Sequence, residues 1–280
     1  MQWEHLSTTA FAEARQQVGG VCLLPFGVLE SHGPHLPLGT DIIEAKTVAI
    51  EAAKLEPAIV FPGYYIGQLA GAQHMPGNIC VRHDLLLQMM DEICREIARN
   101  GLKKIIIVNA HGGNTAFVQF FLQSTLQQKK DYIVYSFSAL SSIGQAIREL
   151  QLNTDGAAES LSDAERQTLA NVVSPGAHAG FGETAMVMGV DEQIVHLERK
   201  DEMDFSNRGR LSDLEQAGLS TWMAWYGKYP NNYSGDPAGA TANIGKAITR
   251  QIAQKAAHAI RLVKQNDEAF ELQNEFFASW

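Results

Sequence analysis

One short segment of the chain mixes acidic and histidine side chains with glycines and prolines, a combination suited to metal binding. Residues 30–41 read Glu-Ser-His-Gly-Pro-His-Leu-Pro-Leu-Gly-Thr-Asp and follow an apolar run at residues 21–27. Apolar runs of this length often form a buried strand, and Glu, Asp and His are ligands of hard and borderline metal ions. The segment therefore predicts a loop that leaves a core strand and aims several ligands at one point, as in a metal-dependent hydrolase.

Another histidine follows the most strongly apolar run in the chain. Residues 104–109 read Lys-Ile-Ile-Ile-Val-Asn, and His111 comes two residues later. Glu30 and His32 are also two positions apart, so extended backbone would point both side chains to one face. The carboxyl ends of parallel strands meet at one edge of a sheet, where ligands bind. Two strands are therefore predicted to end in candidate metal ligands at the same edge.

Asp41 has two interpretations. Thr40 could cap a helix with Asp41 favourably placed in its first turn, which is common and requires no metal. The nearby Glu30 and His32 favour the second interpretation, in which the carboxylate of Asp41 bridges two metal ions.

A third cluster reads His178-Ala-Gly-Phe-Gly-Glu183. Glu183 would open a helix, and glutamate in a first turn is commonplace, so this position alone is weak evidence for a ligand. The spacing does not put His178 on a helical face with Glu183, which favours a free acid or base over a second ligand.

Together the clusters supply two imidazoles and three carboxylates. The predicted metal ligands are Glu30, His32, Asp41, His111 and Glu183. Two divalent cations among three negative charges leave a net positive centre, which can lower the pKa of a water and polarise a carbonyl oxygen. The mixed nitrogen and oxygen set suits Zn, Mn, Fe or Co. His178 could then protonate a leaving nitrogen as a general acid.

The remaining histidines carry weaker signals. His35 follows a Gly-Pro turn and suits a hydrogen bond to a metal ligand or a purely structural hydrogen bond. His74 lies in a loop and is either a pocket residue or an ordinary loop residue. The candidate substrate-pocket residues are His74, Gly112 and Gly113. His5, His83, His196 and His258 lie outside any cluster and are expected at the surface or in the core. The sequence has no phosphate-binding loop and no Gly-x-Ser-x-Gly elbow, which argues against nucleotide-driven and serine-hydrolase chemistry.

Strand-like and helix-like segments alternate, which predicts an α/β fold with a mostly parallel sheet covered on both faces. The expected strands are residues 21–26, 58–65, 104–109 and 132–137, and the expected helices are 41–55, 85–99, 114–128, 183–190 and 240–265. Residues 151–175 read as an insertion or flexible excursion, and residues 199–215 as a solvated face. The aromatic residues 222–229 favour core packing or a subunit contact over a substrate pocket. Without repeats or a convincing linker, residues 1–280 are expected to form one domain.

Whole-chain properties narrow the class of protein. A net charge of −9 without a dense Lys/Arg stripe argues against a nucleic-acid partner. Three scattered cysteines are too few for a disulfide framework. No signal peptide is visible and no apolar run approaches the roughly 20 residues of a membrane helix. The sequence therefore predicts a cytoplasmic enzyme acting on a small molecule, with no membrane partner.

The motifs resemble the creatininase family of metal-dependent amidohydrolases. The matching segments are residues 25–41, the Asn-Ala-His-Gly-Gly-Asn at 109–114, and the His-Ala-Gly-Phe-Gly-Glu-Thr at 178–184. Residues 63–77 resemble the family's His-x-x-Pro-Gly loop, and Gly-Asp-Pro at 235–237 a later motif. The resemblance implies a three-layer α/β/α sandwich, a two-metal site holding Zn and/or Mn, hydrolysis of amide C–N bonds and a homo-oligomer, a hexamer in the creatinine-hydrolysing enzymes.

The resemblance also implies roles for individual residues. Glu30, Asp41 and His111 look like ligands of one metal, and His32 with a bridging Asp41 like ligands of the other. His178 matches the family's proton-shuttling histidine.

Two departures bear on the substrate. Creatinine-hydrolysing members carry a metal-ligating glutamate where this chain has Gly113, so Glu183 is the candidate replacement. Those members also carry a tryptophan just before the His-Ala-Gly motif, whereas residues 173–177 of this chain contain no tryptophan. Formamido-pyrimidines, cofactor-precursor peptides and cyclic polyol ketones remain open beside creatinine. A non-catalytic metal-binding oligomer is an alternative to an enzyme, and a structural α/β protein is a third.

Overall fold

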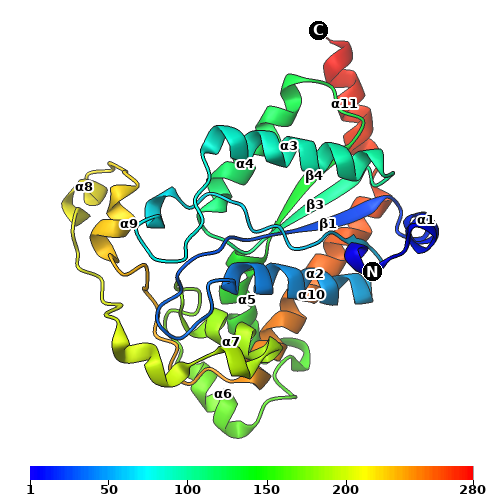
Figure 1. The fold of residues 1–280 in the computed structure, drawn as a ribbon. Helices are drawn as coiled ribbons and strands as arrows, with labels where there is room; N and C mark the ends of the chain where they lie inside the picture. The colour runs from blue at the N-terminus through cyan, green and yellow to red at the C-terminus, as the bar shows by residue number, and fades with distance from the viewer. Residues whose placement is uncertain (280) are drawn as a thin grey trace.

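Four parallel strands form the centre of the computed structural model, which describes residues 1–279 apart from the side chain of Asp155 (Figure 1). The strand order is β2-β1-β3-β4. The strands are β1 (Val21–Phe26), β2 (Ile59–Val60), β3 (Lys104–Asn109) and β4 (Ile133–Ser138). Phe26 pairs with Asn109, and Asn109 pairs with Ser138, so three strands end level with one another. This register brings the loops after β1 and β3 to one edge of the sheet.

Helices cover both faces of the sheet, which confirms the predicted α/β/α layers. One face carries α2 (Thr40–Leu55), α5 (Ala139–Gln151), α7 (Phe181–Val190) and α10 (Ala242–Gln265), and the other carries α1 (Thr8–Gln17), α3 (His83–Arg99) and α4 (Asn114–Ser124) (Figure 1). Successive strand side chains alternate between the layers: Leu23 and Ile106 pack with the first group, and Leu24 and Ile105 with the second. Strands β1 and β3 are almost continuously apolar because helices cover both of their faces.

Three predicted elements differ in the structure. The expected strand at 58–65 is regular only at β2, because Pro62 follows closely and has no N–H to continue the ladder. The expected helix at 114–128 ends at Ser124 and continues as a 3₁₀ turn. The segment at 151–175 is no flexible excursion: it contains α6 (Asp163–Ala170), which begins with a capping box of Ser162 and Glu165.

Further elements were not predicted. They are α8 (Ser212–Gln216), α9 (Met223–Lys228) and α11 (Glu268–Ala278), besides α1 and α5. The 3₁₀ turns are η1 (Trp3–His5), η2 (Ala70–Ala72), η3 (Thr125–Gln127), η4 (Thr154–Gly156), η5 (Glu192–Ile194) and η6 (Leu197–Glu202). Helices α8 and α9 lie together at the left of the view, and α11 extends from the top (Figure 1).

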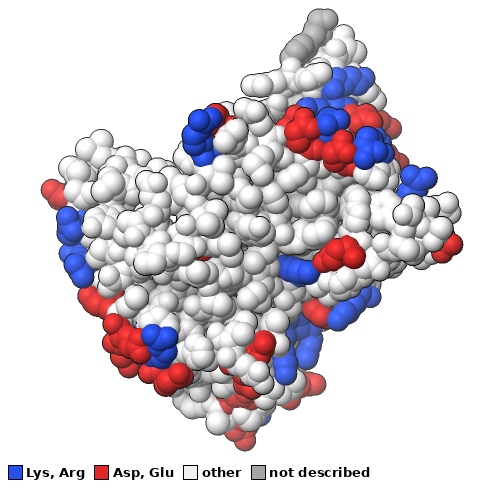
Figure 2. Space-filling model, viewed as in Figure 1, with Lys and Arg blue, Asp and Glu red and all other residues white. Residues whose placement is uncertain are grey.

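Charged side chains are mixed on the face drawn in Figure 2. Lys and Arg lie in small groups beside Asp and Glu, mostly toward its margin, and a broad uncharged area extends across the rest of the face (Figure 2). None of the helices within residues 1–279 has the length and apolar character needed to span a membrane.

Candidate metal centre

The predicted ligands converge beyond the carboxyl ends of β1 and β3. Glu30 and His32 come from the loop after β1, and His111 follows β3. Asp41 lies in the first turn of α2, and Glu183 in the first turn of α7. All five side chains are buried. The level strand ends therefore place residues that are up to 153 positions apart in one cluster.

Asp41 stands between the two histidines. Its Oδ1 lies 3.1 Å from Nε2 of His32, and its Oδ2 lies 2.9 Å from Nδ1 of His111. The same nitrogen of His111 is 3.0 Å from Oε2 of Glu30, while Nε2 of His32 is 3.8 Å from Oε2 of Glu183. Each carboxylate oxygen of Asp41 thus faces a different imidazole, which is the arrangement a bridging ligand needs. A carboxylate that only favoured the start of α2 would not need to lie against both imidazoles, so the helix-capping interpretation of Asp41 does not account for these contacts.

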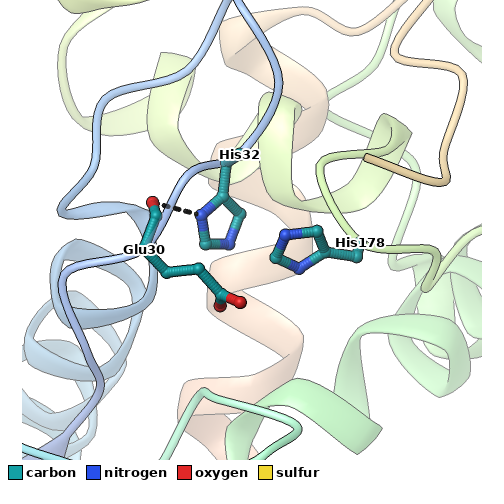
Figure 3. Close-up of side chains that lie close together, drawn as sticks. All are labelled: Glu30, His32 and His178. Atoms are coloured by element: carbon teal, nitrogen blue, oxygen red, sulfur yellow. Dashed lines mark hydrogen bonds between the residues drawn. The ribbon is translucent and has the colours of Figure 1, made fainter. Parts of the chain in front are cut away.

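Both histidines are oriented through their second ring nitrogen. Nδ1 of His32 lies 3.0 Å from the carbonyl oxygen of Glu30, as the dashed line in Figure 3 marks. Nε2 of His111 lies 2.9 Å from the carbonyl oxygen of Gln68, whose N–H in turn donates to Oδ1 of Asn114. When one ring nitrogen donates its hydrogen to a backbone carbonyl oxygen, the tautomer is fixed, and the other nitrogen keeps a lone pair that can bind a metal ion. Both lone pairs face the carboxylates.

The cluster has a strongly perturbed protonation pattern. Burial favours the neutral form of Glu30, yet the imidazoles of His111 and His178 lower its pKa to about 2. Burial likewise opposes protonation of His32, but Asp41 and Glu183 raise its pKa to about 10. Positive charge is therefore strongly favoured among these carboxylates, and protons or metal ions can supply it.

Several buried atoms in the cluster have no hydrogen-bond partner. They are Oε2 of Glu30, Nε2 of His32, Oδ2 of Asp41 and both carboxyl oxygens of Glu44. Burying a polar atom without a partner costs free energy. These atoms are carboxylate oxygens and an imidazole nitrogen, which are the atom types that bind metal ions. Ligand atoms of Glu30, Asp41 and His111 all lie within 4.8 Å of one another. The residues present thus fit a divalent metal site.

Sequence reasoning missed Glu44. It lies three residues after Asp41 on α2, and that i to i+3 spacing is the signal that could have placed both carboxyl groups on one face. Burial and the nearby carboxylates of Glu183 and Asp41 raise its pKa well above the usual value. Glu44 therefore adds a fourth buried carboxyl group to the cluster.

His178 faces the cluster from the loop before α7. Its ring lies 4.1 Å from the ring of His32, between centroids, and Figure 3 shows both rings beside the Glu30 carboxylate. Nε2 of His178 lies 3.1 Å from the carbonyl oxygen of Ser31. Glu30, His32 and His178 also form a group whose ligand atoms lie within 4.8 Å. The geometry permits either an acid or a ligand at this position.

A cavity of about 380 Å³ opens onto the cluster. Its walls include Glu30, Asp41, His111, His178 and Glu183, together with Gly112 and Gly113. Trp222, Trp225 and Tyr229 line the cavity as well. Residues 222–229, expected in core packing or a subunit contact rather than a pocket, therefore contribute three aromatic side chains to the cavity wall.

Two further histidines have structural contacts near the site. His74 lies outside this cavity but lines a neighbouring one of about 730 Å³. Its Nε2 is 2.9 Å from the carbonyl oxygen of Pro230, and its ring packs edge-on against Tyr226 of α9. His35 is the structural hydrogen bonder that the sequence suggested, with Nε2 2.9 Å from Oγ1 of Thr184. Burial lowers the pKa of His35 to about 4, so it is neutral near pH 7.

Comparison with known sequences identifies the family. A sequence model of the creatininase family, described as creatinine amidohydrolase, matches residues 4–260. The chain belongs to the creatininase family. It is therefore a hydrolase of that family, as the sequence motifs predicted.

The relatives differ in substrate. Creatinine amidohydrolase of Pseudomonas putida is 32% identical over 112 residues, which are 38% of this chain and 43% of that enzyme. The mycofactocin precursor peptide peptidase of Mycolicibacterium smegmatis is 26% identical over 245 residues, 85% of this chain and 83% of the peptidase. The 2-amino-5-formylamino-6-ribosylaminopyrimidin-4(3H)-one 5'-monophosphate deformylase of Methanothermobacter thermautotrophicus is 36% identical over 91 residues, 31% of this chain and 37% of the deformylase. The matches to the first and third span under half of those enzymes.

Solved creatininase structures share the fold. A manganese creatininase has a TM-score of 0.71 at 20% identity, covering 93% of this chain and 97% of that one. A mutant creatininase of the Zn–Zn type has a TM-score of 0.66 at 20% identity, with coverages of 93% and 96%. These neighbours confirm the α/β architecture.

Gly113 gives this family member a local constraint. A Cβ atom at this position would lie 2.5 Å from Nε2 of His111 and 2.9 Å from the carbonyl oxygen of Gln68. These are the two atoms whose contact orients the imidazole. The backbone seen here therefore leaves no room for a glutamate side chain at position 113.

We expect Gly113→Ala to displace the ring of His111 and weaken metal binding about 10–100-fold, the usual effect of disturbing the groups that orient a ligand. Gly112→Ala is the matched control, because its added Cβ would meet only Leu140 at 3.4 Å. Titration of the metal-free proteins with Mn²⁺ in the presence of a competing chelator measures the difference. Equal affinities in the two variants would contradict the constraint.

Proposed function

We propose that this protein is a metal-dependent amidohydrolase that cleaves the C–N bond of a small cyclic or formyl amide with two divalent ions, Zn and/or Mn. The observation that carries the proposal is the placing of the two Asp41 oxygens against two separate imidazoles. The manganese and zinc forms of structurally similar creatininases support these metals. Zinc and manganese both accept mixed imidazole and carboxylate ligands.

We assign the ligands to two sets that share Asp41. Glu30, Asp41 and His111 would hold one ion, and His32, Asp41 and Glu183 the other. Glu183 would supply the carboxylate that creatinine-hydrolysing members carry at the position of Gly113. When bound, such ions lower the pKa of a water and polarise the amide carbonyl oxygen.

His178 is the proposed general acid. With its Nε2–H donated to the carbonyl oxygen of Ser31, the other nitrogen of a neutral ring, Nδ1, is the proton acceptor. We propose that Nδ1 takes up a proton from the water that attacks the amide carbonyl carbon and delivers it to the departing nitrogen as the C–N bond breaks. Trp225, whose ring lies edge-on to that of His178 at 5.7 Å, would shield this transfer from water.

One observation favours a second, longer class of substrate. The cavity over the cluster shares Gln68, Gly71, Gly113 and Trp222 with a neighbouring cavity of about 730 Å³. The neighbouring cavity has mostly apolar walls, which include Phe117, Phe120, Met223 and Tyr226. An amide with an extended apolar group, such as the end of a peptide, would fill both spaces. The peptidase relative, matched over 83% of its length, supports this candidate.

We also propose that residues 1–280 act as one domain and that the chain forms a homo-oligomer in the cytoplasm. The exposed rings of Phe120 and Trp222 and the side chain of Met223 offer apolar surface for a subunit contact. The thiols of Cys22, Cys80 and Cys94 are free, which suits a reducing compartment. Light scattering on the purified protein would give the number of subunits.

Metal removal tests the proposed function. We expect about two divalent ions per chain by elemental analysis, loss of hydrolysis after chelation, and recovery with Mn²⁺ or Zn²⁺. The stripped protein should unfold at a lower temperature, because binding to the native state alone stabilises it. Creatinine, formamides, lactams and short peptides form the substrate screen. A protein that binds no divalent ion, or whose hydrolysis survives chelation, would contradict the proposal.

A further inference from the structure

One buried amide side chain connects three parts of the candidate site. Asn232 lies in the loop after α9 and has no exposed surface. Its Nδ2 donates to Oε1 of Glu30 and to the carbonyl oxygen of Ser31, each at 2.9 Å. Its Oδ1 accepts from Nε1 of Trp225 at 2.6 Å. Both N–H groups and the acceptor are therefore in use, as expected of a buried amide that fixes its neighbours.

The backbone of the same loop is also fixed. Asn232 has a φ of 50°, in the left-handed region that asparagine tolerates better than most residues. The N–H groups of Ser234 and Gly235 donate to the carbonyl oxygen of His178 at 3.2 and 3.0 Å. The loop thus holds the main chain of His178 while the Asn232 side chain reaches its surroundings.

The contact with Glu30 determines which carboxylate oxygen faces the other ligands. Asn232 occupies Oε1, while Oε2 lies 3.0 Å from Nδ1 of His111 and is without a hydrogen-bond partner. A hydrogen bond to one oxygen restricts rotation of the carboxyl group. Outer hydrogen bonds of this kind orient metal ligands and commonly affect metal affinity.

The other contacts relate His178 to the cavity wall. Nδ2 of Asn232 lies 3.3 Å from Nε2 of His178, and both atoms approach the carbonyl oxygen of Ser31. The Asn232 oxygen holds the indole of Trp225, which packs edge-on against the His178 ring. A single amide therefore fixes the candidate acid, one candidate ligand and one cavity wall relative to one another.

We propose that Asn232 is a positioning residue: it turns Oε2 of Glu30 toward the metal and sets the His178 ring against Trp225. The part that concerns metal rests on the proposed function. The part that concerns Trp225 and His178 is a property of the metal-free protein as well.

Asn232→Gly tests the proposal, since glycine accepts the left-handed backbone while the substitution removes the side chain that carries the amide. We expect Mn²⁺ to bind about 10–100-fold more weakly, kcat on the amide found in the screen to fall by a similar factor, and KM to change less. The fluorescence of the metal-free protein should also change, because the indole of Trp225 loses its hydrogen-bond acceptor.

Asn232→Asp separates the two functions of the amide. At a pH where the new carboxyl group is ionised, the variant keeps an oxygen for Trp225 but has no hydrogen to donate to Glu30 or Ser31, so fluorescence should stay near that of the wild type while kcat falls. Asn231→Gly is the matched control: its side chain donates to the carbonyl oxygen of Asp204, away from the site, and the variant should behave as wild type. If Asn232→Gly does not fold, the Asp variant provides the same kcat test.

The outcomes are distinct. A folded Asn232→Gly protein with wild-type Mn²⁺ affinity and kcat would overturn the inference, even with a lowered melting temperature, because Asn232 would then be only structural. Equal losses in Asn231→Gly would overturn it as well. A wild-type protein that binds neither Mn²⁺ nor Zn²⁺ would instead refute the proposed function, and the fluorescence comparison would still test the contact with Trp225.

Discussion

Replacing Asp41 by asparagine is expected to lower hydrolysis by about 10³-fold or more and to remove at least one metal ion. The substitution keeps the shape of the side chain but replaces one ligand oxygen with an amide nitrogen. That nitrogen would face either His32 or His111, each of which now has its own Asp41 oxygen at 3.1 or 2.9 Å. Loss of a metal ion removes several kcal/mol of transition-state stabilisation, which corresponds to the expected factor.

The matched control for Asp41→Asn is Asp84→Asn. Asp84 also lies in the first turn of a helix, but it is exposed and pairs with Arg82. Elemental analysis and initial rates should show two ions and unchanged hydrolysis in this control. Should Asp41→Asn retain both ions and the wild-type rate, the bridging role would be refuted and the helix-capping interpretation would return.

His178→Gln is expected to lower kcat by about 10²–10⁴-fold while leaving both metal ions in place, as for loss of a general acid. The side chain of glutamine keeps hydrogen-bonding capacity near the Ser31 carbonyl oxygen, which His178 contacts at 3.1 Å. It cannot, however, exchange a proton with a leaving nitrogen. Measured rates together with metal content per chain provide the test.

Metal content distinguishes the two functions that the geometry permits for His178. Because Glu30, His32 and His178 also form a possible ligand group, a ligand role would make His178→Gln lose metal. That result, or a wild-type rate in the variant, would contradict the assignment as acid. His196→Gln is the control, since the side chain of His196 is exposed and forms an ion pair with Glu198.

The architecture of this protein follows closely from its sequence. Long apolar runs at 21–26 and 104–109 alternate with amphipathic helices, and that pattern is enough to predict parallel strands buried on both faces. Because strands of a parallel sheet end at one edge, the sequence also predicted that Glu30, His32 and His111 would meet. Short elements such as α9 were missed, since a helix of six residues has little periodicity to detect.

The sequence by itself determined which residue types gather at the strand ends, because the chain direction and the spacing of Glu30, His32 and His111 are local properties. Only the tertiary structure decided how they are used. It placed Asp41 between two imidazoles, buried Glu44 beside it, and positioned the segment around α9 so that Trp222, Trp225 and Tyr229 line the cavity. It also brought Asn232 to Glu30 across 202 positions of sequence. Such contacts depend on packing between distant segments, and no local pattern in the chain encodes them.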